Sequence, residues 1–236
     1  MPVSADLTAD LKKVVLALEA DLRERVASQA HVRAEWEEQY REAVKRERTA
    51  MSWQAWRDDR VTQAAVAWVL TSVFIRFCED NSLLKPVWLA GPPARRQEAL
   101  DAELAYVRRH PEHTNREWME QAISYLGAVP GTKALVESHS PLWLVSPSGQ
   151  ATKVLVDFWR AKTDDGDLIR DFADPQLSTR FLGDLYQDLS DYAKKTFALL
   201  QTPEFVEEFI LDQTMEPALA ERSLEGFTLI DPTCGS

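Results

Sequence analysis

The stretch that decides the fold is Val61-Thr-Gln-Ala-Ala-Val-Ala-Trp-Val-Leu-Thr-Ser-Val-Phe-Ile-Arg-Phe77, which follows Asp58-Asp59. Its large apolar residues occupy almost every face of a helix instead of a single stripe. Such a helix has to be covered on most sides, so we predict that it forms the centre of an amino-terminal core. Burial of each large side chain, including Trp68, is expected to contribute about 1.5–3 kcal/mol.

Further helices are predicted on both sides of this core helix. From Ser4 to Ser28, apolar residues recur at steps of three and four, which indicates an amphipathic helix. The stretch 31–48 is charged on nearly every face and predicts a solvated helix with i,i+4 ion pairs. The Pro- and Gly-containing stretch 86–96 predicts a loop. Additional helices are expected over 97–110, 115–127, 178–191 and 203–215, and a short apolar helix or turn is expected over 152–160.

The acidic stretch Asp164-Asp165-Gly166-Asp167 marks a predicted boundary between two domains. It lacks the ligand spacing and the terminal Glu of a calcium loop, so we interpret it as a solvated linker. The prediction is a helical domain over residues 1–163, followed by a second domain that starts within 164–236.

Composition restricts the classes of function. The chain has 236 residues, 45% of them hydrophobic, which is typical of a packed core. Its 38 acidic and 27 basic residues give a net charge of −11. This sign disfavours a domain that binds nucleic acid over its whole surface. The acidic balance leaves open a local basic patch, for which Lys194-Lys195 is the best candidate.

Cysteine and histidine usage predicts no metal site. Cys78 and Cys234 are the only cysteines, too few for a disulfide framework or a Cys-based zinc site. His110 and His113 flank Pro111-Glu112, and we interpret them as loop residues instead of a ligand pair.

The sequence has no run of about 18 uninterrupted apolar residues, the length that a membrane-spanning helix requires. Its acidic, Ser-containing start does not resemble a signal peptide. We therefore expect a cytoplasmic protein without a membrane partner.

The carboxyl-terminal tip predicts the start of a cofactor site. Phe227 to Ile230 is a short apolar run typical of a buried parallel strand, and it leads into Asp231-Pro-Thr-Cys-Gly-Ser236. In doubly wound folds, ligands bind at the carboxyl ends of strands, where a glycine turn lets the backbone approach them. Cys234 is interpreted as a small residue in that turn, because no neighbouring base is evident that would make it a nucleophile.

A second segment, Thr202-Pro203, precedes a predicted helix. Thr202 is a favourable N-cap, and Pro203 stands where its missing N–H costs nothing. Taken alone, the segment indicates only a capped helix.

Together the two segments resemble the γ-class adenine-specific DNA methyltransferases, which include the modification subunits of type I restriction systems. In that family a Thr-Pro helix precedes an apolar strand that ends in Asp-Pro-x-Cys-Gly. The Arg-Phe-x-Glu-Asp sequence at Arg76–Asp80 and the Leu-Gly-x-Leu-Tyr sequence at Leu182–Tyr186 are also similar to large fused enzymes of this type.

The resemblance implies a mainly α chain: a helical domain followed by the truncated start of an α/β Rossmann-like domain that binds S-adenosylmethionine. By position, the cofactor-binding candidates that it implies are Thr202, Pro203, Asp231, Pro232, Cys234 and Gly235. The Asn/Asp-Pro-Pro-Tyr/Phe loop that holds the target amine does not occur in this sequence, so no catalytic residue is assigned.

The function that the resemblance implies is methyl transfer from S-adenosylmethionine to the N6 amine of adenine in DNA, in phage defence. We expect DNA contacts from a carboxyl-terminal part outside this sequence, and an inactive fragment. Two alternatives stay open: a non-catalytic helical module that binds other defence proteins, and an enzyme of the same class that methylates a protein side-chain amide.

Overall fold

The computed structural model describes residues 5–174, 177, 180–189, 202 and 204–230 of the chain. Over these residues the regular structure is helical, with one isolated antiparallel bridge between Lys162 and Leu168. The chain divides into two compact units, Met1–Tyr192 and Ala193–Ser236. The prediction of a mainly helical chain is confirmed.

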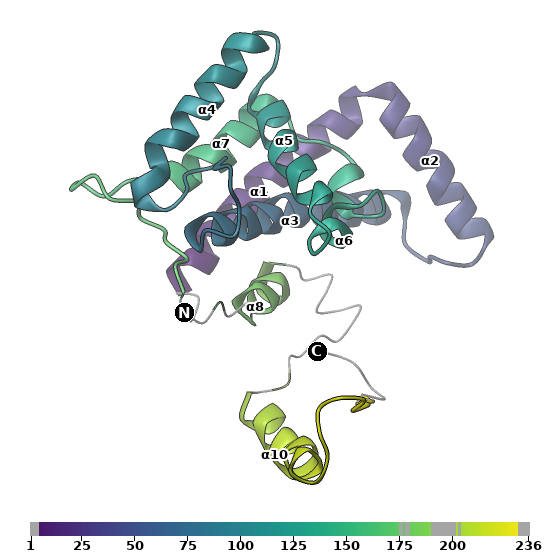
Figure 1. Cartoon of the computed structure of the whole chain (residues 1–236). Coiled ribbons are helices and arrows are strands. Elements are labelled where there is room, and N and C mark those ends of the chain that lie inside the picture. The colour runs from purple at the N-terminus through teal and green to yellow at the C-terminus, as the bar shows by residue number, and fades with distance from the viewer. Residues whose placement is uncertain (1–4, 175–176, 178–179, 190–201, 203, 231–236) are drawn as a thin grey trace. The chain divides into compact units, whose positions relative to one another are not determined.

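The core helix is α3 (Trp53–Asp80), and it runs through the middle of the first unit (Figure 1). It begins before the predicted Asp58, because the Ser52 hydroxyl accepts a hydrogen bond from the Ala55 N–H and caps the helix. Trp68 is fully buried, and its Nε1 donates to the carbonyl of Leu142 over 3.1 Å. The predicted position of this helix at the centre of the core is confirmed.

Two helices from the start of the chain cover part of α3. α1 (Ala5–Ser28) packs along it and buries the apolar stripe predicted from the sequence. α2 (Ala30–Lys45) turns away from α1 and contacts both α1 and α3 (Figure 1). The buried Trp36 of α2 meets Trp56 edge-on, with ring centroids 6.4 Å apart.

The rest of the first unit consists of shorter helices. They are η1 (Pro93–Arg95), α4 (Arg96–Arg109), α5 (Asn115–Ala128), α6 (Lys133–Val136), η2 (Pro141–Trp143), α7 (Gly149–Arg160) and α8 (Arg180–Leu189). α5 packs against α6 and α7, while α7 and α8 pack against α1 and α3. A capping box between Thr114 and Glu117 starts α5 where the sequence predicts it.

The acidic stretch Asp164–Asp167 forms a tight turn inside the first unit. The Thr163 N–H donates to the Asp167 carbonyl over 2.8 Å, and the Gly166 N–H donates to the Thr163 carbonyl over 3.0 Å. α8 follows this turn and still belongs to the first unit, where Phe181 stacks on Phe172. Along the sequence, the first unit therefore extends past residue 163 and ends at Tyr192. The domain limits 1–163 and 164–236 stay a prediction for a longer protein.

The second unit contains α10 (Glu204–Glu221), which continues through Pro217 beyond the predicted end at residue 215. Residues 227–230 have irregular structure, so the predicted strand Phe227–Ile230 is not observed. A parallel strand needs a neighbouring strand to satisfy its backbone groups. The described ranges provide none, and no Rossmann-like portion is seen in them.

By length and composition alone, α3 would also be able to cross a membrane. Most of its apolar segment is buried inside the structure, however, against the protein's own helices. This burial is typical of a core helix, as the sequence predicts for residues 61–77.

Candidate functional site

The Arg-Phe-x-Glu-Asp sequence at the end of α3 forms a fully buried charge cluster. The guanidinium of Arg76 lies 2.8 Å from the Asp80 carboxylate and 3.3 Å from the Glu79 carboxylate, and all three side chains are fully buried. Arg76 Nη1 also donates to the carbonyl of Gly91 over 2.7 Å. Buried charges of this kind are stable only when they are paired and hydrogen-bonded.

The Glu79 carboxylate holds the loop that follows α3. It accepts four backbone N–H groups, those of Trp88 (2.5 Å), Leu89 (2.8 Å), Ala90 (3.2 Å) and Gly91 (2.8 Å). Gly91 has φ +62°, and a Cβ at this position would lie 2.4 Å from Val87 Cγ1. Only glycine fits this tight wrapping of backbone around a carboxylate.

Asp80 and Asn81 bind a second, more distant segment. The Phe172 N–H donates to Asp80 Oδ2 over 2.9 Å, and Asn81 Nδ2 donates to the Phe172 carbonyl over 2.9 Å. The Asp174 N–H donates to Asn81 Oδ1 over 2.8 Å. The motif therefore joins α3 to residues 88–91 and 172–174, which is a structural role.

Burial raises the pKa of Asp80 to about 7, although Arg76 and the Phe172 N–H oppose the shift. Burial is the largest cause, because it disfavours the ionised carboxylate, and the nearby carboxylates of Asp171 and Glu79 add smaller contributions in the same direction. Asp80 is therefore the proton-binding member of the cluster near neutral pH.

A pH dependence of stability follows. Between about pH 4 and pH 7 the folded protein keeps a proton that the unfolded chain has released, so the free energy of unfolding falls as the pH rises through this window. We expect a fall on the order of 2 kcal/mol, reduced by solvent screening, that Asp80→Asn lacks. Urea denaturation of both proteins at pH 5 and pH 7 measures the difference. Equal pH slopes would contradict it.

Cys78 occupies the variable position of the motif. It is buried, and burial raises the pKa of its thiol to about 11, with a further contribution from Glu79. A thiol in this state is not a nucleophile at neutral pH.

An aromatic cavity of about 250 Å³ lies between the 86–88 segment and helices α4 and α5. Trp118 packs against Trp88 and Tyr106, with ring centroids 4.8 and 5.3 Å away. Its Nε1 donates to the Trp88 carbonyl over 3.1 Å. The cavity is smaller than the roughly 300–1,000 Å³ usual for small-molecule sites.

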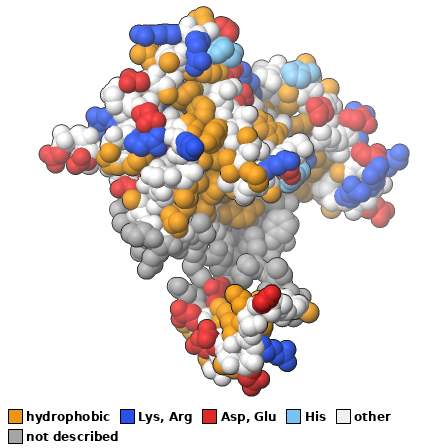
Figure 2. Space-filling view, viewed as in Figure 1, with side chains coloured by type: hydrophobic (Ala, Val, Ile, Leu, Met, Phe, Trp, Pro, Cys, Tyr) orange, Lys and Arg blue, Asp and Glu red, His pale blue; other side chains and the backbone are white. Residues whose placement is uncertain are grey.

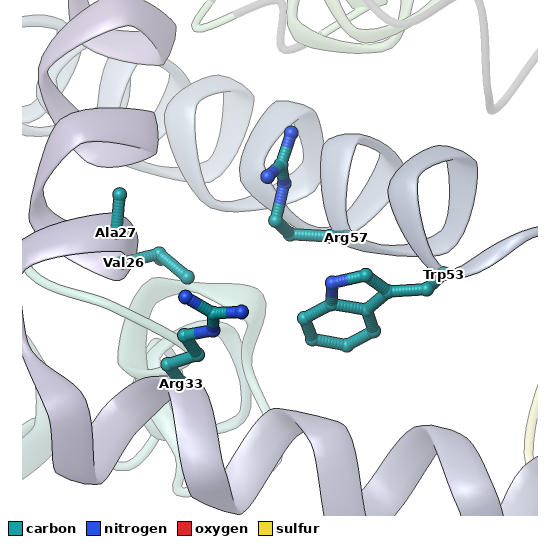
Figure 3. A pocket seen from close by; sticks show the side chains of 5 residues that line it. All are labelled: Val26, Ala27, Arg33, Trp53 and Arg57. Carbon is teal, nitrogen blue, oxygen red and sulfur yellow. The ribbon is translucent and has the colours of Figure 1, made fainter.

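A second pocket of about 110 Å³ lies where α1, α2 and α3 meet (Figure 3). Arg33 points into it from α2, and Trp53 and Arg57 line it from α3. Arg33 Nε lies 2.8 Å from Glu37, and Arg57 Nη2 lies 2.7 Å from Asp58. Because both guanidinium groups have carboxylate partners, this pocket carries no excess charge for an anion.

Of the predicted cofactor-binding residues, the structure describes Thr202 alone. Thr202 is partly buried and lies in irregular structure shortly before α10. Pro203, Asp231, Pro232, Cys234 and Gly235 lie outside the described residues, as do Lys194 and Lys195. The cofactor-site assignment therefore stays a prediction.

A comparison with curated proteins finds a similar protein that is described as an adenine-specific methyltransferase. It is PglX of Streptomyces coelicolor, which is 47% identical to this chain over 239 aligned residues. The match covers 98% of this chain and 20% of that protein, so the chain spans about a fifth of the length of the relative. The resemblance inferred from the motifs is thereby confirmed as a sequence relationship.

No protein-family profile matches the chain. No solved structure matches it either.

Proposed function

We propose that this chain is the amino-terminal part of a site-specific DNA methyltransferase that transfers a methyl group from S-adenosylmethionine to the N6 amine of adenine. The single observation that carries the proposal is the similarity to PglX along nearly the whole chain. The cofactor supplies the reactive methyl group, and the protein positions and orients the two reactants.

The order of the sequence motifs supports the cofactor assignment. Thr202-Pro203 precedes α10, and Asp231-Pro-Thr-Cys-Gly235 follows it after a short connection. We propose that these two segments form opposite walls around the methionine part of S-adenosylmethionine. The loop that grips the target adenine, and most of the DNA contacts, would come from parts of the protein outside this sequence. On this proposal the chain alone is inactive.

The surface of the second unit supports an incomplete domain. Figure 2 shows hydrophobic side chains gathered on α10 beside acidic ones. Phe205 and Phe209 are 72% and 62% exposed, and Leu229 and Ile230 are 63% and 80% exposed. Large exposed apolar residues in one small unit mark a surface that another part of a protein covers. We propose that the remaining methyltransferase domain covers it.

The first unit would act as a scaffold in this enzyme. Its core is continuous from α1 to α8, and its buried charge cluster joins loops instead of facing solvent. The acidic balance of the chain agrees with docking to other phage-defence proteins of a type 2 BREX or phage-growth-limitation system in the cytoplasm.

The self-contained core of the first unit also favours a second candidate, a non-catalytic module that binds other defence proteins. The DNA methyltransferase and the non-catalytic module differ in whether methylation depends on the predicted cofactor-binding segments, Thr202-Pro203 and Asp231–Gly235. An enzyme acting on protein side-chain amides would depend on them too, but would leave DNA unmodified.

The proposed enzyme is expected to lose DNA methylation when Asp231 is replaced by alanine. In the full-length protein, Asp231→Ala removes an acidic group at the predicted strand end beside the cofactor. N6-methyladenine in host DNA should fall by more than about 100-fold, a loss of about 2.7 kcal/mol or more of transition-state stabilisation. Mass spectrometry of digested DNA measures it.

Asp157→Ala is the matched control, since Asp157 is an exposed carboxylate on α7 of the first unit. It should leave methylation unchanged. Full methylation of DNA by the Asp231→Ala protein would contradict the assignment of Asp231 to the cofactor site. No N6-methyladenine with the unaltered protein, together with retained partner binding, would favour the non-catalytic module.

A further inference from the structure

Three potential metal ligands gather where α4 ends. The donor atoms of His110, Glu112 and His113 all lie within 4.8 Å of one another. His110 and His113 are partly buried and Glu112 is exposed, so the group is open to solvent on one side. His113 Nε2 lies 3.5 Å from Glu112 Oε1.

The backbone fixes this cluster before any ion binds. His110 ends α4, and its N–H donates to the Tyr106 carbonyl over 2.9 Å. The His113 N–H donates to the His110 carbonyl over 3.0 Å and closes a turn around Pro111. The negative end of the α4 dipole at this turn favours a cation.

Tyr106 orients one of the rings. Its hydroxyl lies 2.7 Å from His113 Nδ1, and its ring packs against His110 at a centroid distance of 4.8 Å. Tyr106 itself is buried and packs on Trp118, so its hydroxyl is held in place. A hydroxyl accepts as well as donates, so it suits a His113 tautomer with Nδ1–H, which leaves the Nε2 lone pair for a metal.

We propose that His110, Glu112 and His113 bind a divalent transition-metal cation of the zinc class, with Tyr106 as a positioning residue. Two imidazoles and one carboxylate are a ligand set that zinc uses, and water would complete the coordination. Ligand atoms around a tetrahedral zinc ion lie about 3.3 Å apart. The observed separation therefore closes by side-chain rotation, in which one of the two nearly parallel imidazole rings turns.

The bound ion would fasten the end of α4 to the start of α5. α5 begins at Asn115, two residues after His113, and carries the Trp118 wall of the aromatic cavity. The site is independent of the proposed cofactor pocket, so loss of methylation and loss of metal binding are separable results.

Calorimetric titration of the untagged chain with Zn²⁺ tests the proposal. One ion should bind per chain, and His113→Ala and His110→Ala should each weaken binding by about 100-fold or more. Glu112→Gln keeps the shape of the turn and should also weaken binding clearly. Tyr106→Phe should weaken it by about 10- to 100-fold, as loss of an orienting hydrogen bond does.

His139→Ala is the matched control, because His139 is exposed and pairs with Glu137 away from the cluster. It should bind Zn²⁺ as the unaltered chain does, and circular dichroism should show that every variant is folded. Zn²⁺ should raise the Tm of the unaltered chain and not that of His113→Ala. The proposal is overturned if the chain takes up no Zn²⁺ saturably, or if uptake survives the loss of both His110 and His113.

Discussion

Trp68→Asp is expected to unfold the first unit at 25 °C. Trp68 lies in the middle of α3, is fully buried, and donates its indole N–H to the Leu142 carbonyl. The substitution removes a large apolar side chain, which typically costs about 3–5 kcal/mol, and adds an unpaired carboxylate to the core. Together these effects approach or exceed the whole stability of a typical domain, about 5–15 kcal/mol.

Circular dichroism melts measure this effect. Leu16→Asp places the same carboxylate on α1 at a residue that is 64% exposed, and it should change the Tm only slightly. Trp68→Phe keeps an aromatic ring but loses the hydrogen bond, and it should remain folded with an intermediate Tm. A cooperative melt of Trp68→Asp near the Tm of the unaltered protein would contradict the central position of α3.

The core could be predicted because its signal is local. In α1 and α3 the spacing and density of apolar residues decide which faces are buried, and Leu11, Leu18 and Trp68 are buried as this pattern requires. The pattern is weaker where the chain is irregular. In the loop segment around Trp143, Leu142 is the fully buried residue and Trp143 is 41% exposed.

The loop partners of Arg76, Glu79 and Asp80 could not be predicted, because residues 88–91 and 172–174 reach these side chains only in the folded unit. The sequence likeness at Arg76–Asp80 pointed to the family without showing that the motif is structural.

The sequence also did not predict that the side chains of His110 and His113 lie together. Their spacing indicated a loop, which is observed, but the buried Tyr106 that orients one ring is a feature of the folded α4–α5 turn. The strand prediction at Phe227–Ile230 depended on partner strands that the described part of the chain does not contain.

Glu79→Gln is expected to lower the free energy of unfolding by about 3–5 kcal/mol, the usual cost of removing one partner from a buried ion pair. The amide keeps one oxygen, but its NH₂ group would face backbone N–H donors that the carboxylate now accepts. The new NH₂ group and the backbone N–H groups are all donors, and burial excludes the water that would otherwise accept from them. The 88–91 segment should therefore separate from α3. Urea denaturation at pH 7 measures the loss. Glu98→Gln is the control, because Glu98 pairs with Arg95 at the surface and its replacement should change the free energy of unfolding only slightly.

The same variant tests why Asp80 holds a proton. In Glu79→Gln, Asp80 is the only carboxylate left to neutralise Arg76, which lies 2.8 Å from it. The pKa of Asp80 should then fall, because ionising Asp80 would make the cluster neutral instead of negative. The decrease in stability between about pH 4 and pH 7 that we expect for the unaltered protein should therefore be somewhat smaller in Glu79→Gln, since burial is the largest cause of the raised pKa and Glu79 adds to it. An unchanged pH slope would show that burial alone, without the competing charge of Glu79, sets the proton affinity of Asp80.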